Sequence, residues 1–273
     1  MKKIGFVDYY ISEWHANNYP GWIKQANERL GLDFQVCYAW AKEELSPVDN
    51  VTTDRWCEKM GITRCDTVEE LCEKSDYIII LAPSNPETHL ELAKAVLPFG
   101  KRTYIDKTFA PDLAIAEEIF ALSRKYNTPF FSTSALRFAS ELKEFEKANN
   151  LVIKGGGSNL EEYIIHTVEI AATLLKEGVG SVKVKRSGED AVGNVITKTG
   201  RTATLEFSPA NDFSVSGTLP DGSVKEMNIS SNFFDVLMEG ILKFFSTGEK
   251  PFDEKETLEA MALRDAFLSV NNK

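Results

Sequence analysis

Short apolar runs alternate with amphipathic stretches over the first half of the chain. The apolar runs are typical of buried strands and cover residues 3–7, 33–40, 76–83, 102–106 and 129–134. Between them, apolar side chains recur at helical spacing in residues 20–31, 52–61, 67–75, 86–100 and 112–127. Strands that alternate with helices in this way predict a Rossmann-like α/β fold with a doubly wound parallel sheet. Pro20 and Gly31 are expected at the two ends of the first helix.

The pattern changes after residue 123. One long helix is expected over residues 160–178, and short alternating strands with Gly and Asp-Gly turns follow it, at 181–187, 191–200, 202–209, 212–222 and 223–230. Two amphipathic stretches close the chain, at 233–248 and 253–270. We therefore expect a dinucleotide-binding domain over 1–123 and an α+β substrate and dimerisation domain with a mostly antiparallel sheet over 124–273. A cleft is expected between the domains, and the C-terminal helix is expected to pack back on the first.

Composition narrows the classes of partner. The chain has 273 residues, of which 43% are hydrophobic, so it can bury a sizeable core. Its formal net charge is −10 without a cluster of Lys or Arg, which argues against a nucleic-acid partner. No apolar run approaches the roughly 18 residues of a membrane span, so no membrane partner is expected. The four cysteines form no CxxC pair, which favours reduced thiols in a cytoplasmic protein.

Polar residues follow two of the predicted strands at the carboxyl edge of the sheet, where open α/β folds bind ligands. After the strand that ends at Ala82 come Pro83, Ser84 and Asn85, and His89 enters the next helix. Exposed backbone and polar side chains at a strand tip suit a flat ligand. A capped loop with His89 on the helix surface is the alternative.

The next predicted strand ends at Asp106 and Lys107. A lysine at that edge can donate a hydrogen bond to a substrate hydroxyl or exchange a proton with it. A surface ion pair is the alternative. On the helix expected over 160–178, Glu162, His166 and Glu169 lie at i, i+4 and i+7, so that two carboxylates would orient the imidazole. A solvated polar face is the alternative there.

The run from Ser75 to Phe138 resembles the Gfo/Idh/MocA oxidoreductase family, which includes glucose–fructose oxidoreductase and inositol dehydrogenase. In that family a strand, a helix starting near a His, a Gly-Lys turn and a Glu-Lys-Pro motif follow in order. This chain has His89, "GKRTYI" and Asp106-Lys107-Thr108 in that order, and then Arg137-Phe138. The segment "GGGSNLEEYIIHTVE" is similar to the family's entry into its second domain. The resemblance covers about residues 60–176 well.

The resemblance implies an NAD- or NADP-dependent oxidoreductase that acts on a sugar, a polyol or a related hydroxy compound. Lys107 would orient the reacting hydroxyl and His166 would take its proton. Arg137, Glu162 and Glu169 would contact the substrate or support the histidine. The cofactor would lie against the carboxyl edge of the sheet, at Tyr9, Tyr10, Ala82, Pro83, Ser84, Asn85, His89 and Asp106. A homo-oligomer, dimer or tetramer, is also implied.

The glycine-rich loop of dinucleotide-binding domains is missing. Asp8, Tyr10 and Glu13 occupy the three glycine positions of the family. Side chains there intrude on the pyrophosphate, and a carboxylate about 4 Å from a phosphate costs about 4 kcal/mol at an effective dielectric constant of about 20. Tyr9 and Tyr10 could stack on a base or fill its place.

Two other functions stay open from the sequence. A non-redox lyase or isomerase would use Lys107 and His166 as acid and base, with Glu162, His166 and Glu169 as a thin candidate ligand set for a divalent metal. No metal is expected on the leading hypothesis. The third hypothesis is a non-catalytic relative that acts as a sugar sensor or as a partner subunit.

Overall fold

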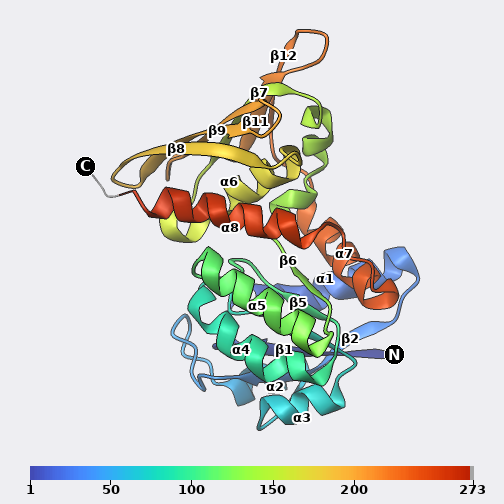
Figure 1. The fold of residues 1–273 in the computed structure, drawn as a ribbon. Helices are drawn as coiled ribbons and strands as arrows, with labels where there is room; N and C mark the ends of the chain where they lie inside the picture. The colour runs from blue at the N-terminus through green and yellow to red at the C-terminus, as the bar shows by residue number, and fades with distance from the viewer. Residues whose placement is uncertain (271–273) are drawn as a thin grey trace. The chain divides into compact units, whose positions relative to one another are not determined.

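The computed structural model describes residues 1–270 and divides into two compact units (Figure 1). Unit 1 contains Met1–Ser132 and Asp235–Pro251, and unit 2 contains Thr133–Phe234 and the chain from Phe252 onward. The expected boundary between residues 123 and 124 falls inside helix α5 (Leu113–Tyr126). The division comes after strand β6 (Phe130–Ser132), because β6 completes the first sheet.

Unit 1 is built on a six-stranded sheet in which every strand pair is parallel, in the order β3-β2-β1-β4-β5-β6. The strands are β1 (Lys2–Asp8), β2 (Phe34–Ala41), β3 (Thr63–Arg64), β4 (Tyr77–Ile80), β5 (Thr103–Ile105) and β6. Ile78, Ile79 and Ile80 of β4 are fully buried, as an apolar strand covered on both faces should be. The predicted Rossmann-like parallel sheet is confirmed.

Helices follow the strands of unit 1, and four of them begin at a side-chain cap. The helices are α1 (Trp14–Leu30), α2 (Thr53–Met60), α3 (Val68–Lys74), α4 (His89–Val96), α5 and α7 (Phe233–Thr247), with 3-10 turns at Pro86–Thr88 and Leu97–Phe99. Thr52, Thr67 and Asp112 each accept a hydrogen bond from an amide in the first turn of the helix that follows. Figure 1 shows α4 and α5 lying side by side.

The first helix differs from its prediction. It begins at Trp14 rather than at Pro20, because the Glu13 side chain caps its first amides. Pro20 lies inside the helix, where its ring nitrogen cannot donate a hydrogen bond to the preceding turn. The residues between β1 and α1 are therefore few, and the three residues found in the glycine positions all lie at or near this turn.

Helix α7, late in the chain, packs on the sheet of unit 1. Phe245 stacks on Tyr77 of β4 with ring centroids 4.8 Å apart, and Phe244 meets Phe131 of β6 at 5.2 Å. Both phenylalanines are fully buried. Helix α8 (Glu254–Leu268) packs within unit 2 against α6 (Leu160–Leu174). The expectation that the C-terminal helix packs back on the first domain stays a prediction.

Unit 2 contains a second six-stranded sheet in the order β12-β11-β7-β10-β9-β8. Only the β7–β10 pair is parallel, so the expected mostly antiparallel sheet is confirmed. Its strands are β7 (Asn149–Gly155), β8 (Val179–Ser187), β9 (Asp190–Thr197), β10 (Thr202–Phe207), β11 (Ser214–Thr218) and β12 (Val224–Asn228). β7 was not predicted, although it lies between β10 and β11.

Helix α6 fills the interior of unit 2. Ten of its residues are buried, including Thr167 and Glu169. Figure 1 shows strands β8 and β9 lying over α6 and α8. Two 3-10 segments, Ala135–Phe138 and Ser140–Phe145, precede β7. These segments and the first turns of α6 carry most of the site residues that the sequence predicts for unit 2.

Candidate functional site

The carboxylate of Asp106 is the meeting point of β5, α1 and the segment that follows β5. It accepts hydrogen bonds from the hydroxyls of Tyr19 and Tyr104 at 3.1 Å and from the amide of Lys107 at 2.8 Å. Nδ1 of His15 lies 3.1 Å from Oδ2 of the same carboxylate. Asp106 is only 1% exposed. Its position fixes the strand tip that presents Lys107 and does not offer a carboxylate to solvent.

Glu13 is the N-cap residue of α1. Its carboxylate accepts hydrogen bonds from the amide of His15 at 2.7 Å and from the amide of Ala16. The side chain is buried. Burial raises the pKa of Glu13 to about 8, although the two amide hydrogen bonds act in the opposite direction. The first amides of the helix are thus satisfied by a resident acid.

Asp8, the last residue of β1, also accepts hydrogen bonds from backbone amides, and these amides belong to two different loops. Oδ1 accepts hydrogen bonds from the amides of Tyr9 at 2.7 Å and Ala82 at 2.9 Å. Burial and the nearby Glu13 carboxyl raise the pKa of Asp8 well above its ordinary range. Ala82 adopts the left-handed conformation, with φ 58°, at the end of the β4 segment. Asp8 therefore fastens the loop that begins at Ala82 to the end of β1.

His89 contacts the backbone at the start of the loop that follows β4. This imidazole is fully buried, with Nδ1 2.9 Å from the carbonyl oxygen of Phe109 and Nε2 2.6 Å from that of Leu81. Burial lowers the pKa of His89, which favours the neutral ring. The alternative of a helix-surface histidine is wrong. Because His89 is fully buried, it could influence a cofactor only by positioning the loop after β4. The structure favours a positioning role.

The predicted contacts that reach solvent lie around Lys107 and the loop itself. Nζ of Lys107 is 3.5 Å from the carbonyl oxygen of Pro83, and Ser84 is exposed. The Lys107–Thr108 peptide bond is cis. Tyr9 and Tyr10 are half-buried after β1, with ring centroids 5.9 Å apart. These side chains and Asn85 form the part of the carboxyl edge that a ligand could touch.

In unit 2 the histidine of α6 has a partner that sequence reasoning missed. Nδ1 of His166 lies 2.6 Å from Oγ of Ser134, which is fully buried and also accepts a hydrogen bond from the amide of Leu136. The ring of His166 contacts the rings of Tyr163 and Phe213 at centroid distances of 5.9 and 5.7 Å. The polar triplet "STS" at the end of β6 was the available signal for Ser134. This arrangement orients the imidazole.

Arg137 and Glu169 form a buried ion pair. Nε of Arg137 donates to Oε2 of Glu169 at 2.7 Å, and Thr133 Oγ1 donates to the same oxygen at 3.1 Å. A second arginine nitrogen lies 2.8 Å from Glu256 of α8, and the guanidinium stacks on Phe252 at 3.9 Å. Arg137 is 6% exposed and Glu169 only 2%.

The placement of this pair bears on two expectations. Glu169 was expected beside His166, and the structure instead commits its carboxylate to Arg137 and Thr133. That commitment also removes Glu169 from the metal-ligand set considered with Glu162 and His166. Over residues 1–270, no three His, Cys, Asp or Glu side chains are placed to hold a metal ion. Glu162 lies one turn before His166 on α6, with its amide capped by Asn159.

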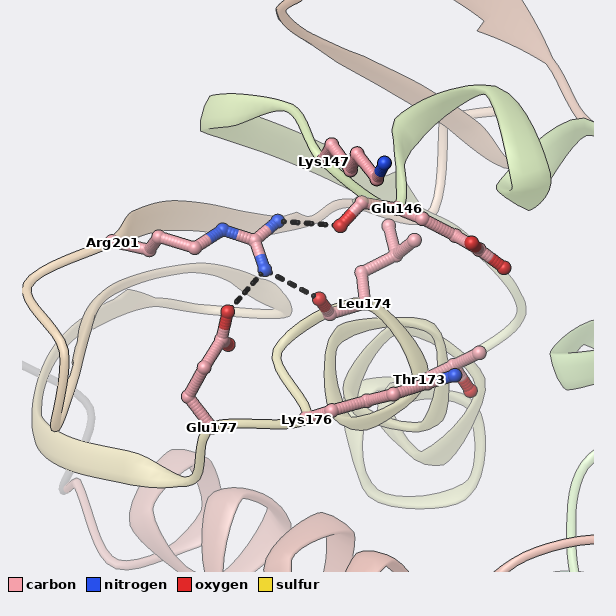
Figure 2. Close-up of a pocket in the computed structure, with 7 residues that line it drawn as sticks. All are labelled: Glu146, Lys147, Thr173, Leu174, Lys176, Glu177 and Arg201. Atoms are coloured by element: carbon pink, nitrogen blue, oxygen red, sulfur yellow. Dashed lines mark hydrogen bonds and ion pairs between the residues drawn. The ribbon is translucent and has the colours of Figure 1, made fainter. Parts of the chain in front are cut away.

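A separate pocket of about 350 Å³ lies in unit 2 at the C-terminal end of α6. Figure 2 shows the guanidinium of Arg201 turned toward the backbone and carboxylate around it. Arg201 donates to the carbonyl oxygen of Leu174 at 2.9 Å, to Glu177 at 2.8 Å and to the carbonyl oxygen of Ala148 at 2.7 Å. Because these donors already serve the chain's own acceptors, the arginine ties the end of α6 to the start of β7.

The residues around β1 and α1 do not fit a dinucleotide in the ordinary pose. That pose places a pyrophosphate on the free amides of the first helix. Here Glu13 occupies the amides of His15 and Ala16, and Asp8 occupies those of Tyr9 and Ala82. Two buried acids therefore stand where the pyrophosphate would be received, and they already accept from the amides that would hold it.

No helix within residues 1–270 combines the length and the apolar character that crossing a lipid bilayer requires. No family model matches the chain. A 57-residue segment is 33% identical to the uncharacterized oxidoreductase YhhX of Escherichia coli, and it covers 21% of this chain and 16% of that protein.

Solved structures match over nearly the whole chain. A probable dehydrogenase from Thermotoga maritima superposes with a TM-score of 0.79 at 15% identity, over 97% of this chain and 95% of that one. UDP-N-acetylglucosamine 3-dehydrogenase GnnA from Acidithiobacillus ferrooxidans gives 0.75 at 12% identity, over 97% of each chain. Biliverdin reductase from Synechocystis, solved with biliverdin and NADP+, gives 0.71 at 14%, over 96% of each. The chain therefore has the two-domain fold of these dehydrogenases and reductases, as the resemblance to the Gfo/Idh/MocA family implies.

Proposed function

We propose that the chain is an oxidoreductase that uses NAD or NADP and acts on a sugar, a polyol or a related hydroxy compound. The observation that carries the proposal is the position of Lys107. It lies two residues after the end of β5, at the carboxyl edge of a parallel sheet, and its amide donates to the buried Asp106. The fold is shared with a dehydrogenase over at least 95% of each chain in the first comparison. Ligands of open α/β sheets bind at this edge.

The proposed chemistry assigns proton handling to two residues. The ammonium group of Lys107 donates a hydrogen bond to the reacting hydroxyl, which lowers the cost of removing its proton. His166 accepts that proton, and Ser134 holds its ring in orientation through Nδ1. Arg137 and Glu169 keep the Ser134 segment in place on α6 through their buried ion pair, and Glu162 is proposed as a substrate contact.

The test begins with binding. NADH and NADPH are titrated against the purified chain, with nicotinamide fluorescence and the melting temperature as readouts, and saturable binding of either is expected. Turnover of a panel of sugars and polyols is then measured for Lys107→Ala and His166→Ala, and each should lose at least a hundredfold in kcat/KM. Lys24→Ala, an exposed lysine of α1, is the matched control. Absence of binding of both nicotinamides would remove the proposal.

A non-redox lyase or isomerase is the second candidate, and the buried Glu13 favours it. An acid–base reaction with Lys107 and His166 needs no pyrophosphate at the α1 N-terminus. This candidate predicts conversion of a sugar-like substrate in the absence of any nicotinamide, with the same loss in Lys107→Ala and His166→Ala. A non-catalytic sensor would instead keep its biological output in both variants.

The setting of the reaction is part of the proposal. All four cysteines are free, and burial raises the pKa of Cys57, Cys65 and Cys72 to between about 11 and about 12. Unreactive thiols suit a reducing compartment such as the cytoplasm. We also propose a homo-oligomer, dimer or tetramer, which sedimentation velocity would test.

A further inference from the structure

Four backbone N–H groups at the carboxyl edge of unit 1 are taken up by two carboxyl groups of the chain itself. Glu13 accepts from the amides of His15 and Ala16, and Asp8 accepts from those of Tyr9 and Ala82. The donors come from two different loops and from the first turn of α1. Anions bind at such places because unpaired amides and the helix dipole attract negative charge.

The two acids are built into the core. Asp8 is 1% exposed and Glu13 is 6% exposed. A third acid, Asp106, lies in the same cluster, with its Oδ2 3.1 Å from Nδ1 of His15. Oδ2 of Asp8 has no hydrogen-bond partner within residues 1–270. A side chain with this degree of burial cannot be displaced in the way that a water molecule is, because its departure breaks two amide hydrogen bonds and rearranges the turn.

The geometry points to Glu13 as a resident substitute for a phosphate group. We propose that its carboxyl group occupies the anion site of α1, so that the pyrophosphate of a dinucleotide reaches these amides only when the Glu13 side chain is removed or displaced. This deepens the proposed function and rests on it for the choice of ligand. The wild-type chain then holds NAD(H) or NADP(H) without the help of these amides.

The experiment is a gain of binding. Glu13→Ser keeps a short capping oxygen that accepts from one amide of the first turn and removes the carboxyl group, so the other amide becomes available. NADH and NADPH should bind at least tenfold more tightly than to the wild-type chain, which corresponds to about 1.4 kcal/mol. Glu13→Gln, whose side chain has the same length, should stay within threefold of wild type because it still fills the site. Adenosine, which has no phosphate, should bind equally to all three.

The controls separate capping from occupation. Asp253→Ser removes another carboxylate cap, that of α8 in unit 2, and should leave dinucleotide affinity unchanged. Melting curves show whether each variant is folded, and Glu13→Asn, another strong capping residue, repeats the test if Glu13→Ser unfolds. Unchanged or weaker dinucleotide binding in the folded Glu13→Ser or Glu13→Asn variant overturns the inference. An equal gain in Glu13→Gln, or an equal gain for adenosine, overturns it too.

The outcomes distinguish this inference from the proposed function. If the wild-type chain binds neither nicotinamide and Glu13→Ser binds one, the inference stands and the oxidoreductase proposal fails. If the wild-type chain and Glu13→Ser bind a nicotinamide cofactor with equal affinity, the oxidoreductase proposal stands and the inference fails. Binding in both, tighter in Glu13→Ser, supports the two together.

Discussion

Nδ1 of His15 lies 3.1 Å from Oδ2 of Asp106, which joins the first turn of α1 to the tip of β5. Tyr19, one turn further along α1, donates its hydroxyl to the same carboxylate at 3.1 Å. The helix and the strand tip are therefore fixed by one buried acid. Because Lys107 follows Asp106 and donates its amide to the same side chain, the position of the proposed lysine depends on this cluster.

Asp106→Asn should destabilise unit 1 strongly. The amide nitrogen of asparagine cannot accept a hydrogen bond, so some of the donors around it lose their partner in a buried site. Breaking a buried charge-assisted network costs about 3–5 kcal/mol, and Tyr19→Phe, which removes one donor, should cost about 1 kcal/mol. Urea denaturation measures both. Asp66→Asn, at an exposed position, is the control and should change the free energy of unfolding by less than about 0.5 kcal/mol.

Ser134→Ala should change the behaviour of His166 without a large loss of stability. The Oγ–Nδ1 contact of 2.6 Å fixes the ring, so its loss frees the tautomer and the ring orientation. We expect a change in the His166 tautomer followed by ¹⁵N NMR, and at least a tenfold fall in kcat on the proposed substrates. Ser134→Thr, which keeps the hydroxyl, should restore the NMR signature. A tautomer distribution identical to wild type in Ser134→Ala would contradict the positioning role.

The two sheets could be predicted from the sequence because their signals are local. β4 is continuously apolar, and β9 and β10 alternate between the two faces, as β8 does from Ser181 onward, so strand type and burial follow from periodicity. β7 was missed because "NNLVIKG" stands between 3-10 segments and glycines, although it pairs with strands far along the chain. Long-range pairing leaves no mark in local pattern.

The sequence identified most of the residues at the candidate site, but not the role that each of them has in the structure. Asp8, Glu13, His89 and Asp106 were all singled out, yet burial decides what each does, and burial depends on packing across several elements. Glu13 illustrates the difference. The sequence shows an acid in a glycine position, and only the structure shows that its carboxyl group binds the amides that a phosphate would use.

Glu13 should also make stability depend on pH. Its pKa rises from 4.5 to about 8 on folding, so the folded chain holds the proton more tightly than the unfolded chain. The stabilisation is complete below about pH 4.5 and is lost as the pH rises through about 8. Glu13→Gln should therefore gain stability relative to wild type between these values. Urea melts at pH 5, 7 and 9 test this, and a constant difference between the two proteins would contradict it.

Arg137 and Glu169 should behave as a buried ion pair in unit 2. Arg137→Met leaves Glu169 charged and buried, and Glu169→Leu leaves Arg137 without one of its two carboxylates, so each should cost about 3–5 kcal/mol of unfolding free energy. The double variant should cost clearly less than the sum, because neither charge is then left without the other. A double-mutant cycle by urea denaturation measures the coupling. Additive effects would show that the two side chains act independently.

Glu141 should give unit 2 an acid-sensitive contact. Burial alone would raise its pKa, yet hydrogen bonds from the Ser231 hydroxyl at 2.6 Å and from the amides of Ser230 and Ser231 lower it from 4.5 to about 2. The folded chain therefore releases this proton more readily than the unfolded chain, and the contact stabilises the fold above about pH 4.5. That contribution, an upper bound of about 3–4 kcal/mol for a pKa that falls from 4.5 to about 2 at 1.36 kcal/mol per pKa unit, is lost as the pH falls toward 2. Glu141→Gln should unfold more easily than wild type at pH 7 and approach it at pH 3, whereas Glu144→Gln, which removes an exposed ion pair to Lys225, should change little at either pH.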